Sequence, residues 1–342
     1  MAILPYSYTL RHNASIINAA THRFKMKTLH ISNTNFEWEL GHRSTLPINE
    51  SLMVHPNFMQ LQFLPFLHAK KGDGVMVTHI PDEVPEGLNV HTYDESPSGY
   101  DHLESWGWSK AIERWSPLPY TVPLCTAEVA AKSFAFTHSP NLPGSQLFRT
   151  PQEVMEWGEE GPFPKVLKTL YGYSGREKWI LKRPEEVIQI KRAVELEFEK
   201  GHQLIGEPWV KRTLDFSTQW YIDNQITFLG STVMKTSEWG FYQETHVGKP
   251  VPFLEEHKEF AKIPLRHLQE RGFLGNVGID AFIYDGNKLH PICEINPRKT
   301  MGWMALTLGK SLSYTSNGKG LLPTELHTPK KITFQKQLKV IR

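Results

Sequence analysis

The sequence has little cysteine and almost no net charge, and each of these features excludes certain classes of protein. Only Cys125 and Cys293 occur among 342 residues, too few for a disulfide framework or a four-cysteine zinc site. This usage favours a reducing compartment. The 38 Lys and Arg residues nearly balance the 36 Asp and Glu residues. The chain as a whole therefore gives no electrostatic reason to expect a nucleic acid or a membrane as partner.

Long apolar runs and two common nucleotide-binding motifs are also missing. No stretch approaches the ~20 apolar residues of a membrane-spanning helix, and residues 1–27 lack the apolar core of a signal peptide. We therefore expect a cytoplasmic protein. Neither the glycine pattern of a dinucleotide-binding turn nor the P-loop pattern occurs. The 39% of hydrophobic residues is enough for a core, and the length suggests about two domains.

The most informative stretch that is present is a predicted β-hairpin. The apolar runs Val277–Tyr284 and Leu289–Ile295 flank Asp285-Gly286-Asn287, and such a turn sequence between two apolar runs predicts a hairpin. Each run carries an acid where a buried strand would take an apolar residue, Asp280 in the first and Glu294 in the second. If the loop holds an odd number of residues, these two side chains share one face. A two-residue turn without a bulge would separate them.

The residues after Glu294 extend this acidic cluster. Asn296 follows by two positions and leaves the same face of the strand, and Arg298 and Lys299 come next. Two carboxylates and an amide oxygen suit Mg²⁺ or Mn²⁺, and the basic pair predicts that an anion binds beside the metal. The alternative is an exposed hairpin whose acids are simply solvated.

Two lysines upstream fit the phosphate side of such a site. Lys168 ends the predicted strand Lys165–Thr169, and the loop Leu170–Arg176 that follows contains two glycines and a serine. Backbone N–H groups of a loop of this kind can close over phosphates. Lys132 lies on the predicted helix Ala127–Phe136. Each lysine alone is more typical of an ordinary surface position than of a phosphate site.

The rest of the chain predicts an N-terminal α/β layer followed by a mixed region. Strands are expected at 27–32, 75–80 and 90–93, with a helix or buried segment at 61–69. A helix at 105–115 ends in the proline-rich segment Ser116–Pro123, which predicts a domain boundary. Thr150-Pro151-Gln152-Glu153 is a helix-start signature. Further helices are expected at 184–199 and 255–270, and strands at 179–181, 204–210, 215–222, 225–229 and 231–235, while 309–342 is expected to contain mixed polar segments.

Taken together, these features resemble the ATP-grasp superfamily, of the carboxylate–amine or carboxylate–thiol ligase type. The resemblance covers roughly residues 120–308. It is carried, in order, by Lys132, by Lys168 with its loop, by Glu207-Pro208-Trp209-Val210, and by Asp280 followed by the segment Glu294–Arg298.

The resemblance implies an α/β fold with ATP held between two antiparallel sheets. It divides the chain into a pre-ATP-grasp α/β domain at 1–117, a small lobe with a lid loop at 118–205, and a large lobe with the metal site and a C-terminal extension at 206–342. It also implies roles for single residues. The residues implied to bind ATP are Lys132, Lys168, Gly172, Ser174, Gly175, Glu207, Trp209, Val210, Asp215 and Phe282, of which Phe282 would pack on the adenine. The implied ligands of Mg²⁺ or Mn²⁺ are Asp280, Glu294 and Asn296, and the implied catalytic residues are Arg298 and Lys168.

The implied reaction is the ATP-dependent joining of a carboxylate to an amine through an acyl phosphate, with release of ADP and phosphate. Small-molecule substrates and a possible homodimer are expected. A small-molecule kinase on the same fold, a non-catalytic nucleotide-binding module and a metal-dependent nuclease are the alternatives. The first metal position is Asp where many members have Glu, which leaves one or two metal ions open. Segments around Asn33–Phe36 and Trp239–His246 are expected to shape the substrate pocket, and Arg212 and Lys235 are as consistent with a surface position as with a substrate contact.

Overall fold

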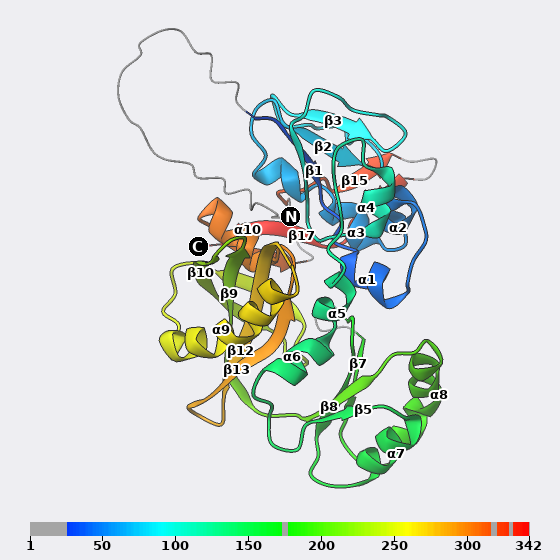
Figure 1. The fold of residues 1–342 in the computed structure, drawn as a ribbon, viewed down its shortest axis with the longest axis vertical. Coiled ribbons are helices and arrows are strands. Elements are labelled where there is room, and N and C mark those ends of the chain that lie inside the picture. The colour runs from blue at the N-terminus through cyan, green and yellow to red at the C-terminus, as the bar shows by residue number, and fades with distance from the viewer. Residues whose placement is uncertain (1–25, 173–176, 316–319, 328–330, 342) are drawn as a thin grey trace, which may run out of the picture.

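The computed structural model describes residues 26–172, 177–315, 320–327 and 331–341 and arranges them as three stacked parts (Figure 1). A parallel sheet from the N-terminal region lies at the top of the view, a large antiparallel sheet in the middle, and a smaller antiparallel sheet at the bottom. The predicted α/β class, with an N-terminal domain before two antiparallel lobes, is confirmed. None of the described helices is long and apolar enough to cross a membrane.

The N-terminal part is a four-stranded parallel sheet in the order β3-β2-β1-β4. The strand β4 was not predicted, since a helix was expected from Ser105 onward. That helix begins only after the N-cap Ser109, whose hydroxyl accepts from two backbone N–H groups. The strand exists through its parallel pairing with β1, a tertiary contact. The elements are β1 (Thr28–Ile31), α1 (Phe36–Gly41), α2 (Ile48–Met53), α3 (Pro56–Leu61), η1 (Leu64–Leu67), β2 (Gly74–Val77), β3 (Asn89–Thr92), β4 (His102–Ser105) and α4 (Lys110–Trp115).

The small sheet has the order β5-β8-β6-β7, and the helices α7 and α8 pack against it. The predicted helix start at Thr150 is confirmed, with both hydrogen bonds of the capping box formed. The helix expected over Ala127–Phe136 is instead two helices, because Ala131 is extended, with ψ 135°. The elements are α5 (Thr126–Ala130), α6 (Lys132–His138), β5 (Gln146–Phe148), α7 (Pro151–Glu159), β6 (Lys165–Thr169), β7 (Lys178–Leu181), α8 (Glu186–Glu199) and β8 (Leu204–Pro208).

The large sheet has seven strands in the order β13-β12-β9-β10-β11-β14-β17. The region 309–342 supplies two of these strands and a separate two-stranded sheet, which its mixed polar sequence did not predict. The elements are β9 (Arg212–Ile222), β10 (Ile226–Thr236), β11 (Tyr242–His246), α9 (Leu254–Glu270), β12 (Gly275–Tyr284), β13 (Lys288–Asn296), α10 (Met301–Leu308), β14 (Ser311–Thr315), β15 (Glu325–His327), β16 (Lys331–Thr333) and β17 (Gln337–Ile341).

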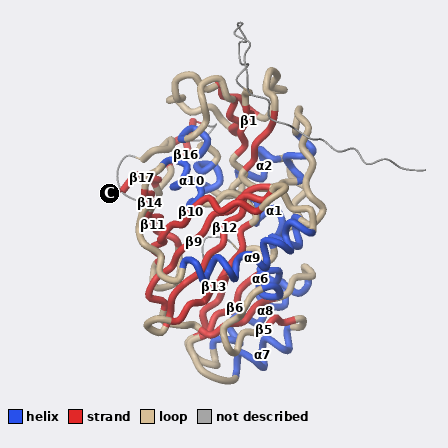
Figure 2. Tube along the Cα trace, turned by 60° about the vertical axis from the view of Figure 1, so that its left-hand side comes forward, coloured by secondary structure: helices blue, strands red, loops and turns tan. Residues whose placement is uncertain are grey.

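The two faces of the large sheet differ in chemistry because side chains alternate along a strand. On β9, Phe216 and Trp220 point toward α9, which lies across the sheet (Figure 2). Ser217 and Gln219 point the other way, toward the start of α10, where the Thr300 hydroxyl donates to the Gln219 amide oxygen at 2.8 Å. One face is therefore an apolar core, and the other is free to carry polar groups.

The N-terminal part packs directly onto this second face. Trp106 and Val75 share one buried cluster with Met304 of α10 and Leu338 of β17. The helices α5 and α6 contribute Val129 and Phe134 to the core under α9. These two helices of the expected small lobe therefore pack with the large sheet, and the small sheet itself begins only at β5. The domain boundaries expected after residues 117 and 205 stay predictions.

A buried histidine links α9 to the large sheet. His257 is fully buried, and its Nδ1–H donates to the carbonyl of Pro291 at 2.7 Å. The Nε2 atom then accepts from the Thr218 hydroxyl at 2.7 Å, and that hydroxyl oxygen accepts from the Trp220 indole N–H. Burial lowers the pKa of His257 to about 4, so the imidazole stays neutral in the folded protein.

We expect this histidine to make stability fall in acid. The unfolded chain takes up a proton at an ordinary histidine pKa of about 6.5, and the folded protein does so only near pH 4. Stability from this group is thus present above pH 6.5 and is lost as the pH falls toward 4. Between pH 7 and pH 5 the loss should be about 2 kcal/mol. Urea unfolding of wild type and His257→Gln at both pH values measures it.

The matched control is His42→Gln, since His42 is exposed. The pH-dependent loss should shrink in His257→Gln and stay at the wild-type value in the control. Equal losses in all three proteins would contradict the assignment.

Candidate active site

The predicted hairpin brings its two acids face to face. Asp280 of β12 pairs directly with Glu294 of β13, which confirms the prediction that they share one face. The turn holds three residues, Asp285–Asn287, since Tyr284 pairs with Lys288. The register then shifts between Asp280 and Phe282, where three residues of β13 oppose one residue of β12. Because β13 has two more residues than β12 in this interval, an even number, the alternation of side chains between the two faces of the sheet is preserved.

The Asp280 carboxyl has its polar contacts within the sheet. The Asn296 amide donates to it at 3.1 Å, and Ser217 also donates from the neighbouring strand. Burial and the negative charge of Glu294 together raise the pKa of Asp280 to about 7. Asp280 thus has no ion pair with a Lys or Arg side chain among the described residues, and a divalent cation would supply positive charge beside it.

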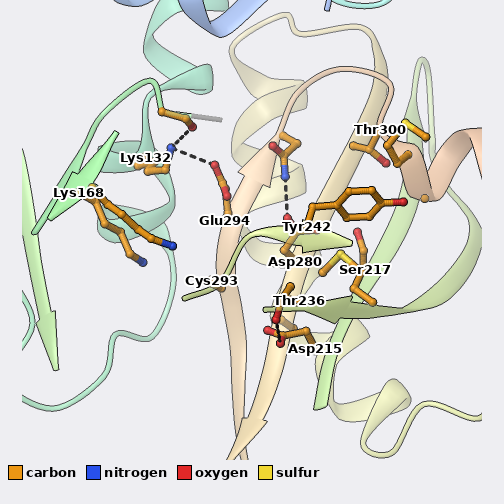
Figure 3. A pocket seen from close by; sticks show the side chains of 18 of the residues that line it. Lys132, Lys168, Asp215, Ser217, Thr236, Tyr242, Asp280, Cys293, Glu294 and Thr300 are labelled. Atoms are coloured by element: carbon orange, nitrogen blue, oxygen red, sulfur yellow. Dashed lines mark hydrogen bonds and ion pairs between the residues drawn. The ribbon is translucent and has the colours of Figure 1, made fainter. Parts of the chain in front are cut away.

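Glu294 has a cation on its other side. Lys132, at the start of α6, lies 3.0 Å from the Glu294 carboxylate and also donates to the Gly172 carbonyl (Figure 3). Burial opposes ionisation of Glu294, but the lysine outweighs it and holds the pKa below the ordinary value. The helix break at Ala131 places Lys132 on the first turn of α6, facing β13.

Two further lysines come from the small sheet. Lys168 of β6 forms an ion pair at 2.5 Å with Glu207 of β8. Burial alone would lower the pKa of Lys168, but Glu207 outweighs it and the pKa is raised. Lys178 of β7 pairs with Lys168 across the hairpin, and burial, Arg212 and Lys168 lower its pKa to about 8. The two ammonium groups thus favour an added anion.

Arg298 is fixed from three directions. Its Nε–H donates to Glu37 of α1, one Nη donates to the Lys299 carbonyl at 3.0 Å, and the other donates to Asn296 Oδ1 at 3.1 Å. A guanidinium has five N–H donors, so two remain free for a ligand among the contacts of the described residues. The arginine thereby joins the N-terminal domain to the end of β13.

The two facing carboxylates, the Asn296 amide, the three lysines and Arg298 border one cavity of about 200 Å³ between the small and large sheets. The predicted residues that line it are Lys132, Lys168, Gly172, Trp209, Asp215, Asp280, Glu294, Asn296 and Arg298. Ser174 and Gly175 lie outside the described residues.

Three predicted residues do not border this cavity in the structure. Glu207 is turned to Lys168 and lines a small neighbouring cavity, and Val210 is not part of the wall. Phe282 is buried, with the Arg212 guanidinium 4.0 Å above its ring and His290 at its side. Arg212 covers the ring, so an adenine would meet Arg212 and Trp209 first.

Several lining residues were not singled out from the sequence. Lys178 could have been found from the register of the β6–β7 hairpin, and Ser217 from the period of two along β9 after Asp215. Thr236 donates to Asp215 at 2.9 Å and lies at the end of β10, one residue beyond the strand expected at 231–235. The remaining ones are Glu177, Met234, Ala281, Cys293, Met301 and Gly302, with Arg212 left open. Gly240, Tyr242 and Thr245 of the lining fall in the segment Trp239–His246 that was expected to shape the substrate pocket, and Thr300 follows Arg298 by two positions.

The structure is similar to those of several enzymes of known structure. Phosphoribosylamine–glycine ligase from Thermotoga maritima has 13% identity and a TM-score of 0.56, covering 91% of each chain. N5-carboxyaminoimidazole synthetase from Staphylococcus aureus, complexed with ADP, has 14% identity and a TM-score of 0.53, covering 87% of this chain and 85% of that one. The sequence matches no protein-family model and no curated protein. At such identities the likeness shows a shared fold.

The clash of charge at Asp280 predicts a gain in stability when the charge is removed. In EDTA at pH 8, Asp280→Asn should raise the melting temperature by roughly 2–4 °C, because the folded state no longer holds two ionised carboxylates together. The same change should abolish stabilisation by Mn²⁺. Differential scanning calorimetry with and without Mn²⁺ checks both effects. A lower melting temperature with the Mn²⁺ response retained would place the cation elsewhere.

Proposed function

We propose that this chain, which has the ATP-grasp fold, is an ATP- and Mg²⁺-dependent ligase that joins a carboxylate to an amine and forms ADP and phosphate. The observation that carries the proposal is the convergence on one cavity of two facing carboxylates, an amide, three lysines and an arginine. A site built for phosphoryl transfer needs charge neutralisation and positioning more than a strong base.

ATP would lie in the cavity between the two sheets. Lys132 and Lys168 are the candidates for the phosphates, and Lys178 adds a third cation on the same side. The lysines now contact Glu294 and Glu207, at 3.0 and 2.5 Å, so incoming phosphates would compete for ammonium groups that are already in place. The adenine ring of ATP would lie beside Trp209, on the connection between β8 and β9.

The metal would be held by Asp280, Glu294 and Asn296, whose oxygens suit Mg²⁺ or Mn²⁺. The fit rests on the direct Asp280–Glu294 pairing and on the raised pKa of Asp280. When bound, the ion would neutralise charge on the phosphates and align them. The choice between one and two ions stays open.

The reaction would proceed in two steps. A substrate carboxylate oxygen attacks the γ-phosphorus, the bond to the β-phosphate oxygen breaks, and ADP leaves. The amine then attacks the carbonyl carbon of the acyl phosphate, the C–O bond to phosphate breaks, and the amine nitrogen loses a proton. Arg298, with two free N–H donors, would hold the acyl phosphate and the oxyanion formed in the second step.

Two features of the ligase stay predictions, the cytoplasmic location and a homodimer. The kinase alternative differs in that the phosphate remains on the product, and the module alternative in that no turnover occurs.

We expect Mg-ATP to stabilise the protein by about 2.7 kcal/mol at a hundred times its dissociation constant. Glu294→Gln keeps the volume of the side chain and removes a metal ligand. It should lower ATP turnover by on the order of 100-fold or more while circular dichroism remains native. A coupled ADP-release assay with mixtures of carboxylic acids and amines measures the turnover.

Two controls complete this experiment. Lys262→Ala changes an exposed residue of α9 and should leave ADP release unchanged. Hydroxylamine should trap the acyl phosphate as a hydroxamate. ADP release without hydroxamate for any acid would favour the kinase, and no stabilisation by millimolar Mg-ATP would exclude the nucleotide site itself.

A further inference from the structure

A second cavity of about 320 Å³ lies between the N-terminal domain and the large sheet. Its wall on one side comes from α1, α3 and η1, and on the other from β11, α10 and β14. Arg298, Tyr242 and Met301 border both this cavity and the ATP cavity. A ligand in the second cavity would therefore reach the guanidinium from the side opposite the nucleotide.

The wall of this cavity is mainly apolar and aromatic. Phe58, Leu64 and Trp106 are buried in it, and Leu61 and Phe241 are partly exposed there. An apolar cavity of about 150 Å³ can hold one benzene molecule. This cavity therefore has room for a ring, or a branched chain of similar size, together with a carboxylate.

Few charges face the same space. The cations on the wall are Arg298, already paired with Glu37, and the exposed Lys336, whose ammonium lies 5.6 Å from the centre of the Tyr314 ring. A phosphorylated ligand would need several donors deep in the cavity. A single carboxylate needs only the two N–H groups that Arg298 has free.

One polar group of the wall has no partner. The hydroxyl of Thr34, which follows β1, is buried and makes no hydrogen bond within the described part of the chain. A buried hydroxyl without a partner costs free energy. Its position on the cavity wall points to a ligand atom as the missing partner.

We propose that this second cavity binds the acid to be activated, and that this acid is a monocarboxylate with an apolar body of about the size of an aromatic ring. The inference rests on the ligase function proposed above. The carboxylate lies at Arg298 and also accepts a hydrogen bond from the Thr34 hydroxyl, and the body contacts Phe58, Leu64 and Trp106.

The test uses the full chain with Mg-ADP and with Mg-ATP. Direct binding of 3-phenylpropanoate, 4-methylpentanoate, glycine, succinate and 3-phosphoglycerate to the Mg-ADP complex is measured by calorimetry, and hydroxamate formation from each acid is measured with Mg-ATP and hydroxylamine. The two apolar acids should bind and form hydroxamate at least tenfold more efficiently than the other three.

Two variants locate the binding in the cavity. Leu61→Trp fills part of it and should raise the dissociation constant of 3-phenylpropanoate at least tenfold, with Mg-ADP binding unchanged. Thr34→Val replaces the hydroxyl with a methyl group of similar size and should weaken the binding of 3-phenylpropanoate several-fold without lowering the melting temperature. Met53→Trp, an equal increase in size at an exposed position of α2, should change neither constant.

The outcomes separate the two proposals. Hydroxamate only from glycine, succinate or 3-phosphoglycerate would overturn the apolar class and uphold the ligase. An apolar acid that binds, responds to Leu61→Trp and yields no hydroxamate would support the cavity and overturn the ligase. Failure of both apolar acids to bind the Mg-ADP complex would overturn the cavity proposal. A dissociation constant that Leu61→Trp leaves unchanged would overturn it as well.

Discussion

The site depends on the burial of two carboxylates on adjacent strands. Asp280 and Glu294 are held in direct register, where each disfavours ionisation of the other. Such a pair is stable only if positive charge surrounds it. The chain places Lys132 on one side, at the start of α6, and Arg298 on the other, directly after β13. The helix break at Ala131 positions Lys132, and the end of β13 at Asn296 positions Arg298, so both features place a cation beside the two carboxylates.

The N-terminal domain takes part in this balance of charge. Glu37 of α1 accepts from Arg298, and Glu104 of β4 pairs with the buried Lys299 at 2.5 Å. The two consecutive basic residues that follow β13 are therefore neutralised by acids from the N-terminal domain. Because a buried pair that loses one partner is strongly destabilised, these contacts fix the N-terminal sheet against the large sheet. The Glu37–Arg298 pair also forms part of the wall of the second cavity.

The parts of the fold that could be predicted are those with a local cause. The hairpin turn, the capping box at Thr150 and the amphipathic helix α9 all follow from residues within a few positions of one another. The break at Ala131 and the strand β4 have no such signal, since each depends on a partner far along the chain. The same holds for β14 and β17, whose mixed sequences become strands only as neighbours in the large sheet.

The sequence by itself determined which chemistry is present: two acids in apolar strands, an amide and an arginine after the second acid, and two lysines upstream. It made the shared face of the two acids depend on the length of the turn, because the side-chain period of a strand is two, and the three-residue turn of the structure placed them together. Only the tertiary structure decided which groups meet. It turned Glu207 toward Lys168, covered Phe282 with Arg212 and brought Glu37 to Arg298 across 261 positions. Local patterns specify the direction of a side chain, whereas its partner depends on how separate sheets pack.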